Sequence, residues 1–128
     1  MERRVVITGL GAITPIGKDV NESWNSILNK KCGIDNISLF DNSTFKTKVD
    51  AEVKNYESQE YFDLKQSKRL DRSSQFAIIA SREAFKDSGI TKENTDFERV
   101  GVFVSSGIAE LSTIQEQCTI NCTKGHNR

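Results

Sequence analysis

Two short hydrophobic runs stand out along the chain. Residues 4–8 are mostly β-branched and end at Gly9, and residues 100–105 form a similar run that ends at Ser106-Gly107. Continuous runs of this kind are typical of strands that are buried on both faces of a sheet. The pattern therefore predicts core strands at 4–8 and 100–105.

A helical period follows the first run. Asp19, with Glu22 three residues later, resembles a capping box at the start of a helix. Apolar residues then recur every three or four positions, and we expect this stripe to lie against the sheet. The stripe consists of Val20, Trp24, Ile27 and Leu28. Gly33 marks the predicted end of the helix.

The middle of the chain divides into a polar and a helical part. Residues 32–57 are rich in Asn, Ser and Asp, and only 45–53 alternate in a strand-like way, which predicts a loop carrying one exposed strand or a small hairpin. Residues 58–88 are mostly helix formers, and Gly89 is their stop signal. Their alanines predict close packing against another helix. Residues 111–122 are either a further short helix or an ordered loop.

The order of these elements is strand, helix, loop, helix, strand. This order indicates the α/β class, in which a parallel sheet is covered by helices. Two core strands are few, because the mean sheet has about five or six. The chain therefore forms either an unusually small sheet or the opening part of a larger domain.

Composition narrows the classes of partner and site. The chain has 128 residues, with 18 basic and 18 acidic side chains, so it has no overall field for a nucleic acid or an anionic membrane. Its apolar runs are too short for a signal peptide or a membrane span, which predicts a cytoplasmic protein. Three cysteines with a single histidine do not form a metal-ligand pattern, and we expect no metal or other cofactor.

A strand followed by Gly9-Leu10-Gly11 and a helix is also the beginning of a dinucleotide-binding motif. The third glycine of that motif would stand at Thr14, and Pro15 follows it. The acidic residue expected about twenty positions later is not placed at a strand end. The sequence therefore favours a structural turn over nucleotide binding.

Four basic residues recur at intervals of three and four within the second helical region. If this stretch is helical, they form one basic face, which suits a small acidic partner. The alternative is a solvated charged face, partly neutralised by Asp63 and Asp71. The four residues are Lys65, Lys68, Arg69 and Arg72.

The opening of the chain resembles that of type II β-ketoacyl-acyl-carrier-protein synthases, from Arg3-Arg4-Val5 through Gly9-Leu10-Gly11 to Thr14-Pro15-Ile16-Gly17. Further similar motifs follow in the family's order as far as Ser105-Ser106-Gly107-Ile108. They are Trp24 with Ile27-Leu28, Gly33-Ile34, Phe40-Asp41, Lys68-Arg69-Leu70-Asp71-Arg72 and Ala84-Phe85-Lys86-Asp87-Ser88-Gly89. The resemblance implies that residues 1–128 are an incomplete N-terminal part of a thiolase-like αβαβα fold, truncated before the nucleophilic cysteine.

The resemblance also implies an activity. Members of this family load an acyl chain onto a cysteine, decarboxylate malonyl-acyl carrier protein and join the two, which lengthens a fatty acid. They work as homodimers and need acyl carrier protein as partner. The chemistry uses a cysteine thiolate and two histidines, whereas this chain has only His126. Cys118-Thr119 has different neighbours from the family's nucleophile, so we expect no catalytic residue and no activity of this chain alone.

Two candidate sites follow from the resemblance. Lys65, Lys68 and Arg69 correspond to positions that meet the acidic helix of acyl carrier protein. Ile108 corresponds to an isoleucine that lines the acyl pocket and gates its depth, against the alternative of plain core packing. The family commonly continues with Gly-Gly-Leu, where this chain has Ala109-Glu110-Leu111. A different reading of the whole chain is a non-enzymatic module that binds acyl carrier protein or another acidic partner.

Overall fold

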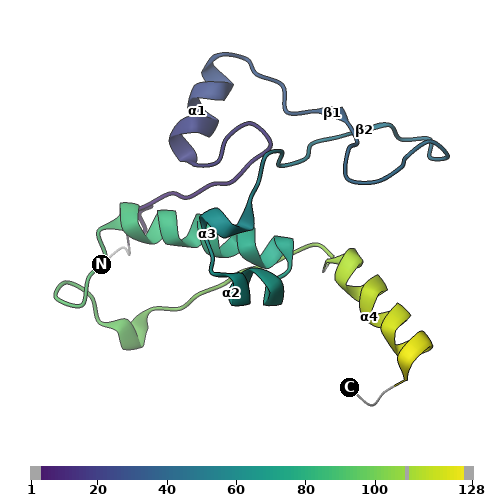
Figure 1. Cartoon of the computed structure of the whole chain (residues 1–128). Helices are drawn as coiled ribbons and strands as arrows, with labels where there is room; N and C mark the ends of the chain where they lie inside the picture. The colour runs from purple at the N-terminus through teal and green to yellow at the C-terminus, as the bar shows by residue number, and fades with distance from the viewer. Residues whose placement is uncertain (1–3, 109, 126–128) are drawn as a thin grey trace.

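The computed structural model describes residues 4–108 and 110–125, and the helix α3 lies at its centre (Figure 1). α3 spans Arg72–Ser88. It begins at Asp71, whose carboxylate accepts a hydrogen bond of 2.7 Å from the backbone N–H of Ser74. It ends at Gly89, which has a left-handed backbone with φ 66°. The predicted stop at this glycine is therefore confirmed.

The helix α1 spans Val20–Leu28 and begins as predicted. The Asp19 carboxylate accepts a 2.7 Å hydrogen bond from the backbone N–H of Glu22, and the Glu22 carboxylate accepts one of 2.8 Å from that of Lys18. This reciprocal pair satisfies amides that the first turn leaves without partners. The end of the helix was predicted wrongly, because α1 stops five residues before Gly33, where Asn29 caps it.

The apolar stripe of α1 does not lie against a sheet. Three of its four residues are more than half exposed: Trp24, Ile27 and Leu28. The buried face instead carries Ser23 and Ser26. The Ser23 hydroxyl lies 3.0 Å from that of Thr14, and the Ser26 hydroxyl donates a 2.7 Å hydrogen bond to the carbonyl of Ile16. α1 therefore packs on the turn before it, through small polar side chains.

The two predicted core strands are wrong for the described residues. Residues 4–8 and 100–105 are extended but pair with no other strand, and Val5 is 94% and Phe103 97% exposed. A strand requires a neighbour for its backbone hydrogen bonds, and neither segment meets one. The first leads into Gly9 and Gly11, which cross α3, and Val102 and Val104 of the second line a hollow together with residues of α3. The sequence predicted an α/β fold, whereas the described residues form helices joined by extended segments, with little sheet.

The sheet in the described part of the chain is a small antiparallel hairpin. β1 (Asp35–Asn36) pairs with β2 (Val49–Asp50). The hairpin predicted within the polar middle region is therefore confirmed, although each strand has only two residues.

Residues 58–88 form three elements. A 3₁₀ turn, η1 (Ser58–Glu60), precedes the six-residue helix α2 (Leu64–Arg69), and α3 follows. The break falls at Leu70 and Asp71, which have extended backbones with ψ of 127° and 164°. An aspartate favours such a break, because its carboxylate caps a new helix better than it tolerates a helix interior.

The alanines of α3 pack against an extended segment, and the predicted helix partner is wrong. A Cβ built on Gly9 would overlap the carbonyl oxygen of Ala84, and one on Gly11 would overlap that of Ala80. Only glycine allows two backbones to approach this closely. The glycine turn is thus a structural element of the packing, as the sequence favoured.

Two carboxylates of α3 hold this segment. Asp87 accepts a 2.9 Å hydrogen bond from the backbone N–H of Leu10, and Glu83 accepts one of 2.8 Å from that of Ala12. Glu83 also accepts a 2.9 Å bond from the N–H of Val20, the first residue of α1. The turn's amides therefore face negative side chains, which would repel a phosphate.

The remaining helix, α4 (Leu111–Lys124), confirms the helical alternative for 111–122. After the 3₁₀ turn η2 (Phe97–Arg99) the chain passes along α3, and α4 projects beyond the rest of the molecule (Figure 1). Among the described residues, no helix combines the length and apolar character that crossing a bilayer requires.

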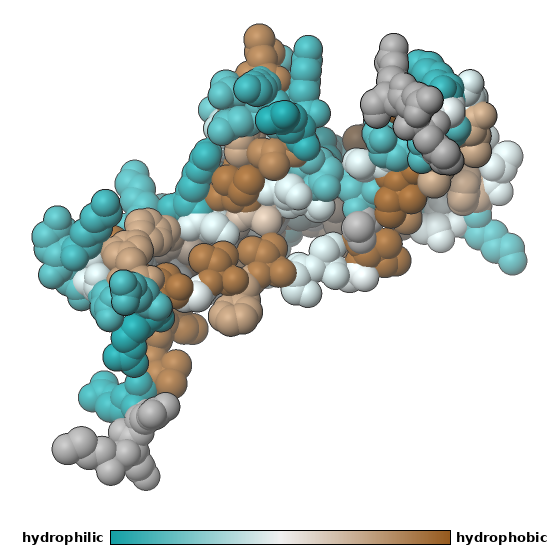
Figure 2. Space-filling view, turned by 90° about the horizontal axis from the view of Figure 1, so that it is seen from below, coloured by the Kyte–Doolittle hydropathy of each residue, from teal (hydrophilic) through white to brown (hydrophobic). Residues whose placement is uncertain are grey.

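The hydrophobic core of the described residues is small. Phe62 and Ile79 are its only buried apolar side chains within 4–108 and 110–125. Hydrophobic residues instead gather on the face seen in Figure 2. Most of the large apolar side chains of the described residues are therefore exposed.

Candidate functional site

The helix α2 presents three of the four predicted basic residues together. Asp63 caps its N-terminus, where the carboxylate accepts hydrogen bonds of 2.9 and 2.7 Å from the backbone N–H groups of Lys65 and Gln66. Lys65, Lys68 and Arg69 are all exposed. Because they stand at i, i+3 and i+4 of one helix, they share a face. We call these three residues the α2 basic face.

No carboxylate in the described residues neutralises the α2 basic face. The ion pairs of that part of the chain join Lys18 to Glu60 and Lys54 to Asp35. Asp71, which could have balanced the face, caps α3, and hydrogen bonds from Ser74 hold the pKa of its carboxyl below the ordinary value. The three cations are therefore available to a partner's acidic groups.

Arg72 does not belong to the α2 basic face, so this part of the sequence prediction is corrected. The break before α3 turns its side chain toward the rings of Tyr56 and Phe76, whose centroids lie 5.2 and 5.1 Å from its guanidinium carbon. Its guanidinium also donates a hydrogen bond to the carbonyl of Val53. Arg72 thus ties α3 to the preceding loop through cation–π and hydrogen-bond contacts.

A buried glutamine lies behind α2 and was missed by the sequence prediction. Gln75 is 6% exposed, and its amide nitrogen donates hydrogen bonds of 3.1 and 2.7 Å to the carbonyls of Ser67 and Leu70. Its amide oxygen accepts a 2.6 Å bond from the hydroxyl of Tyr56. Burial raises the pKa of Tyr56, so this hydroxyl stays protonated and donates. Gln75 follows two serines in the polar first turn of α3, so the sequence around it gave no signal of this burial.

Ile108 lies between the extended segment 100–106 and α4, apart from the α2 basic face. It is 71% exposed, and its carbonyl accepts a 2.8 Å hydrogen bond from the hydroxyl of Ser106. The predicted core strand that would have placed it at a strand end is absent here. The predicted role of Ile108 as the wall of an acyl pocket stays a prediction.

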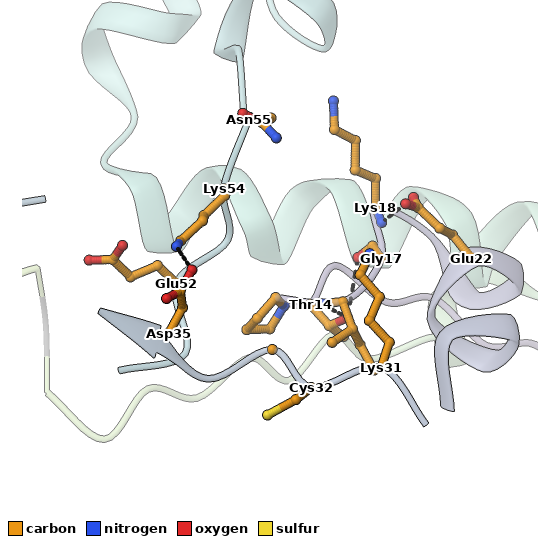
Figure 3. A pocket seen from close by; sticks show the side chains of 13 residues that line it. Thr14, Gly17, Lys18, Glu22, Lys31, Cys32, Asp35, Glu52, Lys54 and Asn55 are labelled. Atoms are coloured by element: carbon orange, nitrogen blue, oxygen red, sulfur yellow. Dashed lines mark hydrogen bonds and ion pairs between the residues drawn. The ribbon is translucent and has the colours of Figure 1, made fainter. Parts of the chain in front are cut away.

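A polar cavity of about 310 Å³ lies between the turn at 14–18 and the segments 31–35 and 52–55 (Figure 3). Most of its charged groups already have partners. Asp35 pairs with Lys54 at 2.7 Å, and Glu52 accepts a 2.6 Å hydrogen bond from the Ser38 hydroxyl. The pKa values of both carboxyls are lowered by these bonds. Lys31 also lines the cavity and makes no ion pair among the described residues.

Comparison with known proteins identifies the family. A family model described as beta-ketoacyl synthase, N-terminal domain, matches residues 2–126. The chain belongs to the β-ketoacyl synthase family. This confirms the resemblance that the ordered motifs indicated.

Three curated relatives of this β-ketoacyl synthase chain are named 3-oxoacyl-[acyl-carrier-protein] synthase 2. A protein from Staphylococcus aureus (strain N315) is 39% identical over 113 residues, which cover 88% of this chain and 27% of the relative. One from Synechocystis sp. is 36% identical over 127 residues, which cover 99% of this chain and 30% of the relative. One from Coxiella burnetii is 39% identical over 124 residues, which cover 97% of this chain and 30% of the relative. The chain thus spans less than a third of these relatives' length.

The cysteines of this β-ketoacyl synthase chain are all free and exposed. Cys118 and Cys122 lie within α4, seven and eleven residues after its first residue, Leu111, and so away from the N-terminal amides that would stabilise a thiolate. Cys32 borders the polar cavity. His126 lies outside the described residues. Within those residues, no cluster of His, Cys, Asp and Glu suited to a metal ion occurs.

Proposed function

We propose that this chain is part of a condensing enzyme that lengthens fatty acids. The reaction joins a cysteine-bound acyl group to the carbanion left by decarboxylation of malonyl-acyl carrier protein. The observation that carries the proposal is the match of residues 2–126 to the β-ketoacyl synthase N-terminal domain. The shared name of the relatives, 3-oxoacyl-[acyl-carrier-protein] synthase 2, supports the same substrate class.

The proposal gives this chain a supporting role in the chemistry. Its single histidine and its helix-borne Cys118 do not provide the thiolate and the paired histidines that the reaction uses. The nucleophile and the oxyanion donors would then come from parts of the complete enzyme that this chain does not cover. On this account, the 128-residue chain alone has no condensing activity.

The α2 basic face is the proposed docking site for acyl carrier protein. Lys65, Lys68 and Arg69 are exposed and lack carboxylate partners among the described residues. Opposite charges on two surfaces accelerate their encounter and set their relative orientation. An acidic helix on the carrier would therefore meet α2 and bring its acyl or malonyl cargo to the enzyme.

Ile108 is the proposed gate of the acyl pocket. Its side chain is exposed and apolar, so a pocket wall contributed by other residues could pack around it. We also propose that the complete enzyme is a cytoplasmic homodimer. The resemblance of the ordered motifs to type II β-ketoacyl-acyl-carrier-protein synthases, which work as homodimers, supports this part of the proposal.

A chimera tests the proposal. Residues 1–128 would replace the matching part of the Staphylococcus aureus relative, and product would be measured with acyl and malonyl carriers. We expect condensation by the chimera and none by the 128-residue chain. A folded chimera that binds carrier but makes no product would favour the alternative of a non-enzymatic binding module. The intact relative is the positive control.

A further inference from the structure

The helix α2 is too short to hold its shape alone. It has six residues, and isolated helices of fewer than about 12 residues are marginal in water. Its N-terminus is secured by the Asp63 cap, and the hydroxyl of Ser67, farther along the helix, lies 2.9 Å from that of Ser58. Its C-terminus needs a comparable support, because the break at Leu70 leaves carbonyls without helical partners.

Gln75 supplies that support from α3. Its amide nitrogen bonds the carbonyls of Ser67 and Leu70 at 3.1 and 2.7 Å. These two residues flank Lys68 and Arg69 along the chain. The glutamine therefore holds the backbone on both sides of two cations of the α2 basic face. An amide side chain has two N–H donors, one for each of these two carbonyls.

The position of the Gln75 amide is itself constrained. Its oxygen accepts the 2.6 Å hydrogen bond from Tyr56, and the backbone N–H of Gln75 bonds the carbonyl of Asp71 at 3.0 Å within the first turn of α3. The side chain is buried, so water does not compete for these bonds. Gln75 thus transmits the rigidity of the 17-residue helix α3 to α2.

We propose that Gln75 is a positioning residue for carrier docking, which it controls by fixing Lys68 and Arg69 on α2. This rests on the proposed function of the α2 basic face. Without Gln75 the charges remain, but the last turn of α2 loosens and the cations no longer match a partner's acidic groups at one spacing. Ordering them then costs free energy when the carrier binds.

The test is a double-mutant cycle on carrier affinity. Gln75→Met keeps the side-chain length and removes the donors, while Lys68→Ala with Arg69→Ala removes the cations through which Gln75 acts. Fluorescence anisotropy with labelled acyl carrier protein gives the dissociation constant of each protein. Gln117→Met, at an exposed position of α4, is the matched control.

We expect Gln75→Met to weaken carrier binding roughly three- to tenfold, the loss of one or two buried hydrogen bonds. The same change in the Lys68→Ala, Arg69→Ala background should have less than about a twofold effect, because coupled residues are not additive. Gln117→Met should leave the affinity unchanged. The amide of Leu70, which bonds the carbonyl of Gln66 at 3.0 Å, should exchange its hydrogen faster in Gln75→Met.

Other results would overturn the proposal in distinguishable ways. Equal weakening in both backgrounds would assign Gln75 a general structural role, and unchanged affinity in the first background would deny it any role in docking. If the double alanine variant itself binds carrier normally, the α2 basic face is not the docking site and both ideas fail. Should Gln75→Met not fold, Tyr56→Phe removes only the hydroxyl that orients the amide. It should weaken binding about twofold, and only while both cations are present.

Discussion

Gly11 crosses α3 so closely that a Cβ at this position would overlap the carbonyl oxygen of Ala80. One turn along, Gly9 and Ala84 repeat the relationship. The first extended segment therefore lies on the backbone of α3 without intervening side chains. The glycines and alanines are complementary, because a larger residue on either side would separate the two backbones.

Gly11→Ala should destabilise the protein by about 1–3 kcal/mol, the usual cost of overpacking at a site that cannot move away. Urea denaturation followed by circular dichroism measures the change. Gly107→Ala is the control, because a Cβ at Gly107 has no atom within 4 Å. Equal stability of the two variants would show that the segment lifts from α3 without cost.

Glu83→Ala should lower the free energy of unfolding by about 1–3 kcal/mol, because it leaves the amides of Ala12 and Val20 without their acceptor. The same denaturation experiment applies. Glu116→Ala on the exposed surface of α4 serves as control and should change stability by less than about 0.5 kcal/mol. A loss no larger than that of the control would mean that water replaces the carboxylate.

Glu52 should make the protein less stable in acid. Hydrogen bonds from the hydroxyl and backbone N–H of Ser38 lower the pKa of its carboxyl from an ordinary value of 4.5. The folded state thus binds this proton more weakly than the unfolded state. The resulting stability is fully present above about pH 4.5 and is lost as the pH falls through the lowered pKa.

Glu52→Gln should therefore flatten the pH dependence of the melting temperature below about pH 4.5. Thermal melts between neutral and acidic pH measure this dependence, with Glu116→Gln as the matched surface control. If the melting temperature of Glu52→Gln fell in acid as steeply as that of the unchanged protein, other carboxylates would be responsible for the acid sensitivity.

The features that could be predicted from sequence depend on neighbouring residues. The Asp19–Glu22 helix start and the Gly89 helix end need only a few consecutive positions, and both are present. The motifs indicated the family because several of them occur in the family's order, which is more specific than any single motif. The three cations of α2 were predicted for the same reason, since their spacing lies within one short helix.

The features that were missed depend on distant partners. Residues 4–8 and 100–105 have strand composition, but a strand forms only where another strand supplies its hydrogen bonds. Arg72 continues the basic spacing of α2, yet the cap at Asp71 begins a new helix and redirects it. Gln75 gave no local sign that the carbonyls of Ser67 and Leu70 would surround it.

Binding of acyl carrier protein tests the central claim most directly. Lys65→Glu with Lys68→Glu should be titrated with the carrier at about 10 mM and about 150 mM salt, where the Debye length is about 30 and 8 Å. Lys86→Glu with Lys92→Glu is the control, because it makes the same charge change at exposed sites outside α2. We predict that the first pair weakens binding about tenfold or more at low salt and less at high salt, while the control binds normally. Equal affinities of the two double variants at both salt concentrations would contradict the claim that the α2 basic face docks the carrier.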